Sequence, residues 1–328
     1  AKAKGGPPPG PPRLLCSPAA AAAEPALLSS EPWDDTVILI DKRLGWTSFD
    51  VVAKLRGALK RRTGKKKLKV GHAGTLDPLA SGLLVVCVGK ATKRIDSFVG
   101  QEKRYVGTAR LGESTPSLDR ETQVDETAEW AALSDEQLAT AAQELTGELA
   151  QLPPMYSALH VGGERLYEKA RRGETVEVEP RNVTVHSARV WRAAGGMDGA
   201  PTAAATASEG EEGDEAYLAA AAAGQDVHFE LACSKGTYVR SWARDFGERL
   251  GTVSHLAALR RTAIGELAVP DGPEMRLMAE PAGGEGAAVP TGAWDVEELV
   301  EIVRELNREA DAAADAAAAG GGAVHAAA

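Results

Sequence analysis

The 328-residue chain lacks the sequence features that mark disulfide-rich proteins, cysteine metal sites and membrane-spanning helices. Its three cysteines, Cys16, Cys87 and Cys233, are odd in number and lack the spacing of a metal site. This usage argues against a disulfide framework and indicates a reducing compartment. No apolar run reaches about 18 residues, so the sequence predicts no transmembrane helix. The formal net charge of −10 argues, at first sight, against a nucleic-acid-binding protein.

The distribution of charge reverses that last exclusion. Residues 36–110 contain 17 Lys or Arg but only 5 Asp or Glu, and acidic residues gather elsewhere, notably in residues 208–215. The densest basic run lies in residues 54–69. A charge run is usually a solvated face, but a basic face also binds phosphates. The local charge is therefore compatible with RNA binding.

The segment GHAGTLDPLASG at residues 71–82 places the carboxylate of Asp77 in a turn rich in small residues. Pro78 disfavours helical backbone at Asp77, and the apolar run 83–88 that follows predicts a buried strand. An acid held on such a loop suits a nucleophile or a general base. An ordinary turn aspartate has the same pattern, because Asp-Pro is a common turn pair.

Strands and helices follow one another without a regular βαβ repeat. The patterns predict strands at 37–40, 83–88, 105–111, 184–191 and 227–234, and helices at 51–60, 134–149, 165–172, 238–250 and 294–306. We expect Ser48 or Asp50 to cap the first helix, and Ser134 and Gln137 to form a capping box at the second. This order predicts an α+β domain around a mixed, largely antiparallel sheet with flanking helices.

Four segments have a biased composition. Residues 1–33 are rich in Ala, Pro and Gly and are predicted to be disordered, either as a plain extension or as the remnant of an organellar transit peptide. Residues 192–225 and 271–292 are predicted to be low-complexity insertions, and residues 309–328 a disordered tail. The folded domain is then expected to span residues 34–308.

Six motifs, in order, resemble those of the TruB family of RNA pseudouridine synthases. They are DKRLGWTS at 41–48, GHAGTLDPLASGLL at 71–84, KRYVGTARLG at 103–112, QLPPMYSAL at 151–159, CSKGTYVR at 233–240 and LAALRR at 256–261. The resemblance covers residues 37–268 apart from one insertion, which is far more than a lone short motif. It implies that residues 34–308 form a catalytic domain with the pseudouridine synthase fold and a central catalytic cleft.

The resemblance assigns catalytic roles to Asp77, Tyr105 and Arg240. Asp77 matches the family's catalytic aspartate, and Arg240 matches the arginine that pairs with it, a geometry that suits the guanidinium fork. Tyr105 matches the tyrosine that stacks on the flipped base, and it is a candidate for removing the 2′ proton of the sugar. From the residues alone, a strand tyrosine and a helix arginine are more often structural.

Three more residues are assigned to substrate binding by the same resemblance. His72 matches the histidine that enters the RNA loop where the target base leaves, which offsets part of the cost of base extrusion. Tyr238 is expected to pack near Asp77 and to support Arg240. Leu259 is expected to form part of the apolar wall against the base.

Supporting and electrostatic roles complete the expected site. Lys42 is expected to hold the catalytic loop through backbone contacts, and Gly71 to support the same loop. Lys65, Lys66 and Lys67 are expected to bind RNA phosphates, because they lie directly upstream of the catalytic turn.

The resemblance implies a tRNA pseudouridine synthase, an isomerase that converts the uridine at position 55 in the TΨC loop and uses no cofactor or metal. Its expected partner is the T stem-loop of tRNA, with no membrane contact, no obligatory protein partner and a monomeric state. The main alternative is a tRNA-folding chaperone of the same family; a guide-RNA-dependent synthase and a ribonucleoprotein scaffold are further rivals. The residues after Pro270 are too few and too biased for a C-terminal PUA domain, so we expect none.

The place of action is predicted from composition and resemblance together. The segments VGHAGTLDPLASGLLVVCVGKATK and GGERLYEKARRGETVEVEPR look most like plant and algal plastid-type members of the family. Together with the basic, acid-poor residues 1–30, they predict a plastid or mitochondrion. The cytoplasm or nucleus is the alternative.

Overall fold

The computed structural model describes residues 13–15, 33, 35–192, 224–269, 294–297, 299–304, 308 and 312. Within these ranges, eleven strands form one mixed sheet. Its main path runs, in spatial order, through β1 (Arg13–Leu15), β2 (Asp35–Lys42), β4 (Ala80–Gly89), β13 (Ser254–Ile264), β5 (Lys103–Leu111), β12 (Asp226–Cys233), β11 (Arg181–Arg192) and β8 (Gly147–Gln151). The side strands β3 (Val70–His72), β14 (Leu267–Ala268) and β15 (Trp294–Asp295) pair with β4, β13 and β2. Most pairs are antiparallel, which confirms the predicted α+β sheet.

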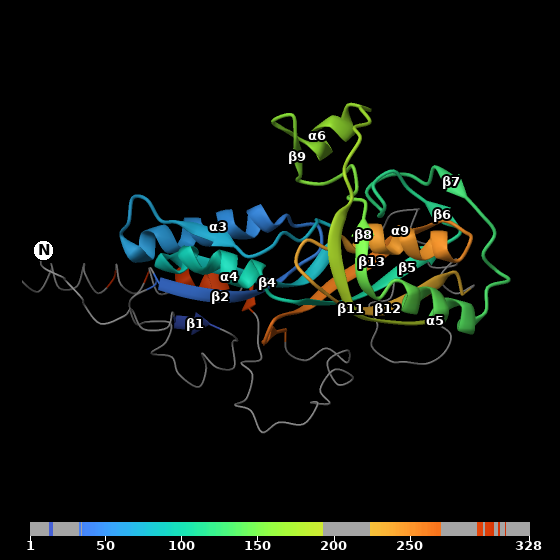
Figure 1. Ribbon diagram of the computed structural model, residues 1–328. Coiled ribbons are helices and arrows are strands. Elements are labelled where there is room, and N and C mark those ends of the chain that lie inside the picture. The colour runs from blue at the N-terminus through green and yellow to red at the C-terminus, as the bar shows by residue number, and fades with distance from the viewer. Residues whose placement is uncertain are drawn as a thin grey trace, which may run out of the picture.

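The helices cover the two halves of the sheet separately (Figure 1). The left half in this view carries α3 (Ser48–Thr63), the 3₁₀ turn η1 (Lys90–Arg94) and α4 (Ile95–Val99), and the right half carries α5 (Asp135–Glu144) and α9 (Val239–Arg249). A small module projects above the middle and contains β9 (His160–Val161), β10 (Glu164–Arg165) and α6 (Leu166–Arg171). The short hairpin β6 (Glu113–Ser114) and β7 (Glu126–Thr127) follows β5.

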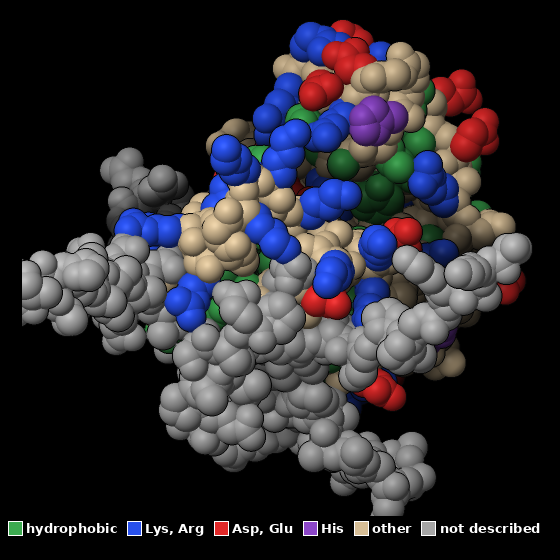
Figure 2. Space-filling model, turned by 90° about the vertical axis from the view of Figure 1, so that its left-hand side faces the viewer, with side chains coloured by type: hydrophobic (Ala, Val, Ile, Leu, Met, Phe, Trp, Pro, Cys, Tyr) green, Lys and Arg blue, Asp and Glu red, His purple; other side chains and the backbone are tan. Residues whose placement is uncertain are grey.

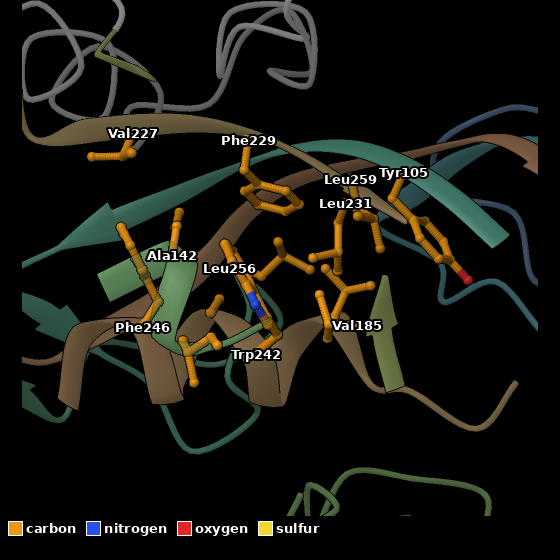
Figure 3. Packing of buried hydrophobic residues seen from close by; sticks show 14 of the residues in the cluster. Tyr105, Ala142, Val185, Val227, Phe229, Leu231, Trp242, Phe246, Leu256 and Leu259 are labelled. Atoms are coloured by element: carbon orange, nitrogen blue, oxygen red, sulfur yellow. The ribbon is translucent and has the colours of Figure 1, made fainter. Parts of the chain in front are cut away.

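Each half has its own hydrophobic core. In the left half, Val52, Leu55 and Leu59 of α3 pack with alternate residues of β2 and β4, and with the helical residues 299–303. In the right half, Trp242 and Phe246 of α9 stack with ring centroids 5.4 Å apart, and Phe229 of β12 lies 4.9 Å from Trp242 (Figure 3). Such aromatic burial anchors α9 firmly against the sheet.

The parallel pair β4 and β13 joins the two halves. Arg261 of β13 lies opposite Gly82 of β4. A Cβ atom at Gly82, whose φ is +97°, would lie 2.3 Å from the carbonyl oxygen of Arg261, so the close approach requires glycine. The loop 73–79 enters β4 at this join, which places it in the middle of the sheet.

Three predicted element boundaries were wrong. The helix predicted at 294–306 begins later, because Trp294–Asp295 forms strand β15 and pairs in parallel with β2. The N-cap of α3 is Thr47, not Ser48 or Asp50, although Asp50 completes the capping box. The predicted helix 134–149 ends at Glu144, because Gly147–Gln151 instead pairs with β11 as strand β8. The capping box of Ser134 and Gln137 is confirmed.

Most of the terminal and inserted segments lie outside the described residues. The expectations for residues 271–292, and for most of residues 1–33, 192–225 and 309–328, therefore fall outside the described part of the chain. Two described parts of residues 1–33 differ from the predicted disorder. Residues 13–15 form β1, which pairs in parallel with β2, and the Trp33 side chain is fully buried in the left-hand core. Within the described part of the chain, no helix is long and apolar enough to cross a membrane.

Candidate active site

A pocket of about 260 Å³ opens at the join between the two halves. Five residues that the motifs singled out line it: Asp77, Tyr105, Tyr238, Arg240 and Leu259. They come from the loop 73–79, from β5, from the start of α9 and from β13. The fold therefore brings together residues that are up to 182 positions apart in the sequence, counted from Asp77 to Leu259.

The loop that carries Asp77 is held at its far side by Lys42. The Lys42 Nζ atom donates to the carbonyl oxygens of Trp46 at 2.7 Å and Arg43 at 3.0 Å, and lies 3.5 Å from that of Pro78. Burial lowers the pKa of Lys42 to about 8, and the charge of Asp77 opposes this shift. Lys42 thus makes the backbone contacts that were expected of a supporting residue.

The start of α3 fixes the same loop. The Ser48 hydroxyl accepts from the N–H of Leu76 at 2.9 Å and donates to the Leu76 carbonyl at 3.1 Å. The N–H of Gly45 donates to the carbonyl of Pro78 at 2.9 Å. Leu76 and Pro78, the residues on either side of Asp77, are therefore both anchored by hydrogen bonds. This anchoring orients the Asp77 carboxylate.

Arg240 lies on the inner face of α9 and reaches three loops. Its Nε is 3.0 Å from Asp77 Oδ2, and its Nη1 and Nη2 donate to the carbonyls of Ser117 at 2.9 Å and Tyr156 at 2.8 Å. Its side chain is 6 % exposed, whereas that of Asp77 is 41 % exposed. A buried, fully bonded guanidinium thus presents one edge to a carboxylate that remains open to the pocket.

A second carboxylate, Asp119, lies on the other side of Arg240. Its Oδ2 is 3.6 Å from Arg240 Nη1, its side chain is 7 % exposed, and its Oδ1 accepts from the N–H of Glu121 at 2.9 Å. Burial raises the pKa of Asp119, and the charge of Arg240 opposes this rise. Sequence reasoning missed Asp119, which lies outside the six motifs in a loop rich in Thr and Ser.

The tyrosines and Leu259 form the walls of the pocket. Tyr105 on β5 is buried, and burial raises its pKa while the nearby guanidinium of Arg261 opposes the rise. Tyr238 is fixed by Gln151, whose amide accepts from the Tyr238 N–H at 2.8 Å and donates to its carbonyl at 3.1 Å. Arg261 also lines the pocket. It was quoted within a motif, but no role was assigned to it.

His72 and Gly71 lie beside the pocket, on β3, and not in its lining. Burial, followed by the charge of Arg261, lowers the pKa of His72, so its imidazole favours the neutral form. A Cβ atom at Gly71 would lie 2.8 Å from the Ile95 side chain, so glycine is needed there for packing against α4. This is a structural reason for the expected supporting role of Gly71.

The three lysines Lys65, Lys66 and Lys67 are exposed in the loop after α3. The 16 residues of α3 span about 24 Å, so the structure places these lysines well away from Asp77. Figure 2 shows Lys and Arg side chains spread over the end of the molecule to which this loop belongs, and upward toward the projecting module. They form part of a basic face rather than of the pocket.

The arrangement supports chemistry at an electrophilic carbon next to a flat ring. An oriented carboxylate can attack that carbon or stabilise positive charge on it. The ring of Tyr105 and the side chain of Leu259 offer apolar surfaces for a planar base. Among the described residues, no group of His, Cys, Asp or Glu has the arrangement of a metal site.

Comparisons with known proteins show the family of this chain. The family model described as TruB family pseudouridylate synthase (N terminal domain) matches residues 60–210. The tRNA pseudouridine synthase B of Flavobacterium johnsoniae is 41 % identical over 245 residues, which cover 74 % of this chain and 94 % of that protein. The protein of the same name from Phocaeicola vulgatus is 39 % identical over 235 residues, covering 72 % and 88 %. The chain belongs to the TruB family of pseudouridine synthases.

Solved structures give more distant matches. A Cbf5–Nop10–Gar1 complex contains a chain that is 26 % identical, with a TM-score of 0.46, over 71 % of this chain and 49 % of that one. An archaeal box H/ACA Nop10–Cbf5 complex gives a TM-score of 0.47 at 21 % identity, over 84 % and 57 %. This chain therefore spans about half the length of the solved chains that it matches.

Proposed function

We propose that this protein is a tRNA pseudouridine synthase that isomerises the uridine at position 55 in the TΨC loop. The observation that carries the proposal is the contact between Arg240 Nε and Asp77 Oδ2, 3.0 Å long, at the edge of a pocket walled by Tyr105 and Leu259. The similarity to bacterial proteins named tRNA pseudouridine synthase B supports the choice of substrate.

The reaction breaks the N1–C1′ bond of uridine, turns the base and joins C5 to C1′. The target base must leave the RNA stack to reach a pocket of this kind. Asp77 acts at C1′ in one of two ways: by forming a bond to it, or by stabilising its positive charge while the 2′ proton is removed. Tyr105 is the candidate for that proton transfer in the second route.

The basic face extends the proposed contact with RNA. Lys65, Lys66 and Lys67 are exposed and would neutralise phosphates of the tRNA outside the pocket, which gives affinity that is independent of base sequence. His72, beside the pocket, is proposed to fill the gap left by the extruded base. We expect the enzyme to act as a monomer on the T stem-loop, without a protein partner or guide RNA.

The test uses an unmodified tRNA transcript with wild-type protein, Asp77→Asn and, as a control, Asp125→Asn, whose side chain is exposed and outside the pocket lining. Pseudouridine is mapped by carbodiimide-dependent primer-extension stops. We expect one stop at the T-loop uridine with the wild type and the control, and none with Asp77→Asn. Tight tRNA binding without any stop would refute the enzyme and favour the RNA-folding chaperone.

We further propose that the protein acts in a plastid or mitochondrion, as a plant or algal type of the family. The support is the composition of residues 1–30, which contain two Lys and one Arg but only one acidic residue. A fusion of residues 1–33 to a fluorescent protein tests this proposal in plant cells. Diffuse cytoplasmic or nuclear fluorescence would contradict it.

A further inference from the structure

Arg261 occupies the centre of the molecule, behind the pocket. It lies on β13, directly opposite Tyr105 on β5 and Gly82 on β4. Directly opposite residues of neighbouring strands have Cβ atoms about 5 Å apart and interact through their side chains. Arg261 is 1 % exposed and lines the same pocket as Asp77.

The guanidinium of Arg261 is bonded to the backbone that leads into the catalytic loop. Its Nη2 donates to the carbonyl of Gly74 at 3.1 Å, its Nη1 lies 3.5 Å from that of Thr75, and its Nε donates to that of Leu83 at 2.8 Å. Lys42 and Ser48 hold the α3 side of this loop, as described above. Arg261 therefore holds the other side of the loop, two to three residues before Asp77.

Among the described side chains, no carboxylate forms an ion pair with Arg261: its guanidinium contacts backbone carbonyl groups and the Tyr105 side chain. Arg240, by contrast, faces two carboxylates. The ionisable groups around Arg261 respond to its charge. With burial, it lowers the pKa of His72 and of Lys103, and it opposes the rise in the pKa of Tyr105. Arg261 and Lys103 both line the pocket, so its wall contains two basic side chains in addition to Arg240.

We propose that Arg261 is a positioning residue of this reaction that also supplies the positive charge favouring an anion in the base pocket. The inference rests on the proposed function. When the N1–C1′ bond breaks, its electron pair stays on the uracil, which becomes an anion. C5 of that anion then bonds to C1′, the C5 proton is lost, and N1 takes up a proton. A fixed charge near the detached base stabilises the anion without reorganisation.

The test compares Arg261→Gln, which removes the charge, with Arg261→Lys, which keeps it. The matched control is Arg192→Gln. Arg192, at the far end of β11, also donates to two backbone carbonyls, those of Gly224 and Leu133. Single-turnover rates are measured on unmodified tRNA with saturating enzyme, together with the tRNA dissociation constant and the melting temperature.

We expect Arg261→Gln to lower the rate about 100-fold, the size expected for loss of one preorganised electrostatic group. Arg261→Lys should recover at least about tenfold of that loss, and Arg192→Gln should stay within about twofold of the wild type. Because Arg261 is buried, the tRNA dissociation constant should change less than about threefold. Equal losses in both Arg261 variants, or a loss confined to binding, would overturn the proposal.

A second readout does not depend on activity. The alkaline titration of tyrosine absorbance is recorded for the wild type and for Arg261→Lys and Arg261→Gln, with Tyr105→Phe to identify the Tyr105 signal. Loss of the charge in Arg261→Gln should move the Tyr105 titration to higher pH. Arg261→Lys should move it as well, because a buried lysine is neutral at the alkaline pH where Tyr105 ionises. An unchanged titration would overturn the electrostatic role.

If the wild type makes no pseudouridine, the proposed function fails, while this titration still decides the role of the Arg261 charge. If Arg261→Gln does not fold, the rate of Arg261→Lys at neutral pH decides: a loss of at most about tenfold supports the proposal, and a larger loss overturns it.

Discussion

Replacing Asp119 by Asn separates the stability of the site from its activity. Asp119 Oδ2 lies 3.6 Å from Arg240 Nη1. With an effective dielectric constant of about 20, charges at that distance attract by about 5 kcal/mol, and the cost of burying an ion is of the same order. The pKa of Asp119 is raised, with burial as the largest cause and Arg240 opposing it. Burial therefore outweighs the attraction.

The sign of the stability effect follows from that shift. A carboxyl whose pKa is higher in the folded state binds its proton more tightly there, so its ionised form subtracts from stability at neutral pH. Removing the charge in Asp119→Asn should therefore leave the free energy of unfolding unchanged or raise it. Arg240, however, loses one of the groups that orient it toward Asp77. Misplacement of a reacting group by about 1 Å can cost about 100-fold in rate, so we expect a loss of about 10- to 100-fold.

The assay is the single-turnover rate of pseudouridine formation, measured alongside thermal unfolding at pH 7. The matched control is Asp245→Asn, because burial also raises the pKa of Asp245 and an arginine opposes that rise, although Asp245 is only half-buried and lies outside the pocket lining. The control should keep the wild-type rate. A wild-type rate in Asp119→Asn, or a loss of rate that parallels a fall in melting temperature, would refute the reasoning.

Other predictions concern binding, acid stability and helix capping. Changing Lys65, Lys66 and Lys67 to Gln should reduce the slope of log affinity for tRNA against log salt by about 2 to 3, measured by filter binding; an unchanged slope would exclude these lysines from phosphate contact. Burial lowers the pKa of His228 and of His255, so the unfolded chain binds protons first, and stability should fall by up to about 1.4 kcal/mol per pH unit for each histidine as the pH drops below about 6.5. Chemical denaturation between pH 7.5 and 5.5 tests this, with His228→Gln expected to flatten the profile. Thr47→Ala removes the N-cap of α3 and should cost about 1 kcal/mol; calorimetry showing no loss would mean that the packing of α3 alone sets its start.

Local patterns in the sequence determined much of the fold and the centre of the site. The apolar run 83–88 lies within β4, and the box of Ser134 and Gln137 starts α5, because both signals act between near neighbours. The six motifs also gave the family, and five of the residues singled out in them line the pocket. Asp77, Tyr105 and Arg240 were found because each lies in its own contiguous motif.

Tertiary contacts decided what the motifs left open. Thr47, rather than Ser48, caps α3, because the Ser48 hydroxyl is occupied by the backbone of Leu76, 28 residues away. The helix predicted to reach Leu149 ends early, because Gly147–Gln151 gains the hydrogen bonds of β11.

The same holds for the two residues that sequence reasoning missed. Asp119 joins the site only because Arg240 bridges it to Asp77, and Arg261 joins it only because β13 lies between β4 and β5 with Arg261 opposite Tyr105. The sequence by itself determined the family and the main elements, and it pointed to Asp77 as the carboxylate proposed to react, since these are written in short segments. The register of the strands and the partners of each buried charge depend on contacts between distant segments, and only the folded structure decided them.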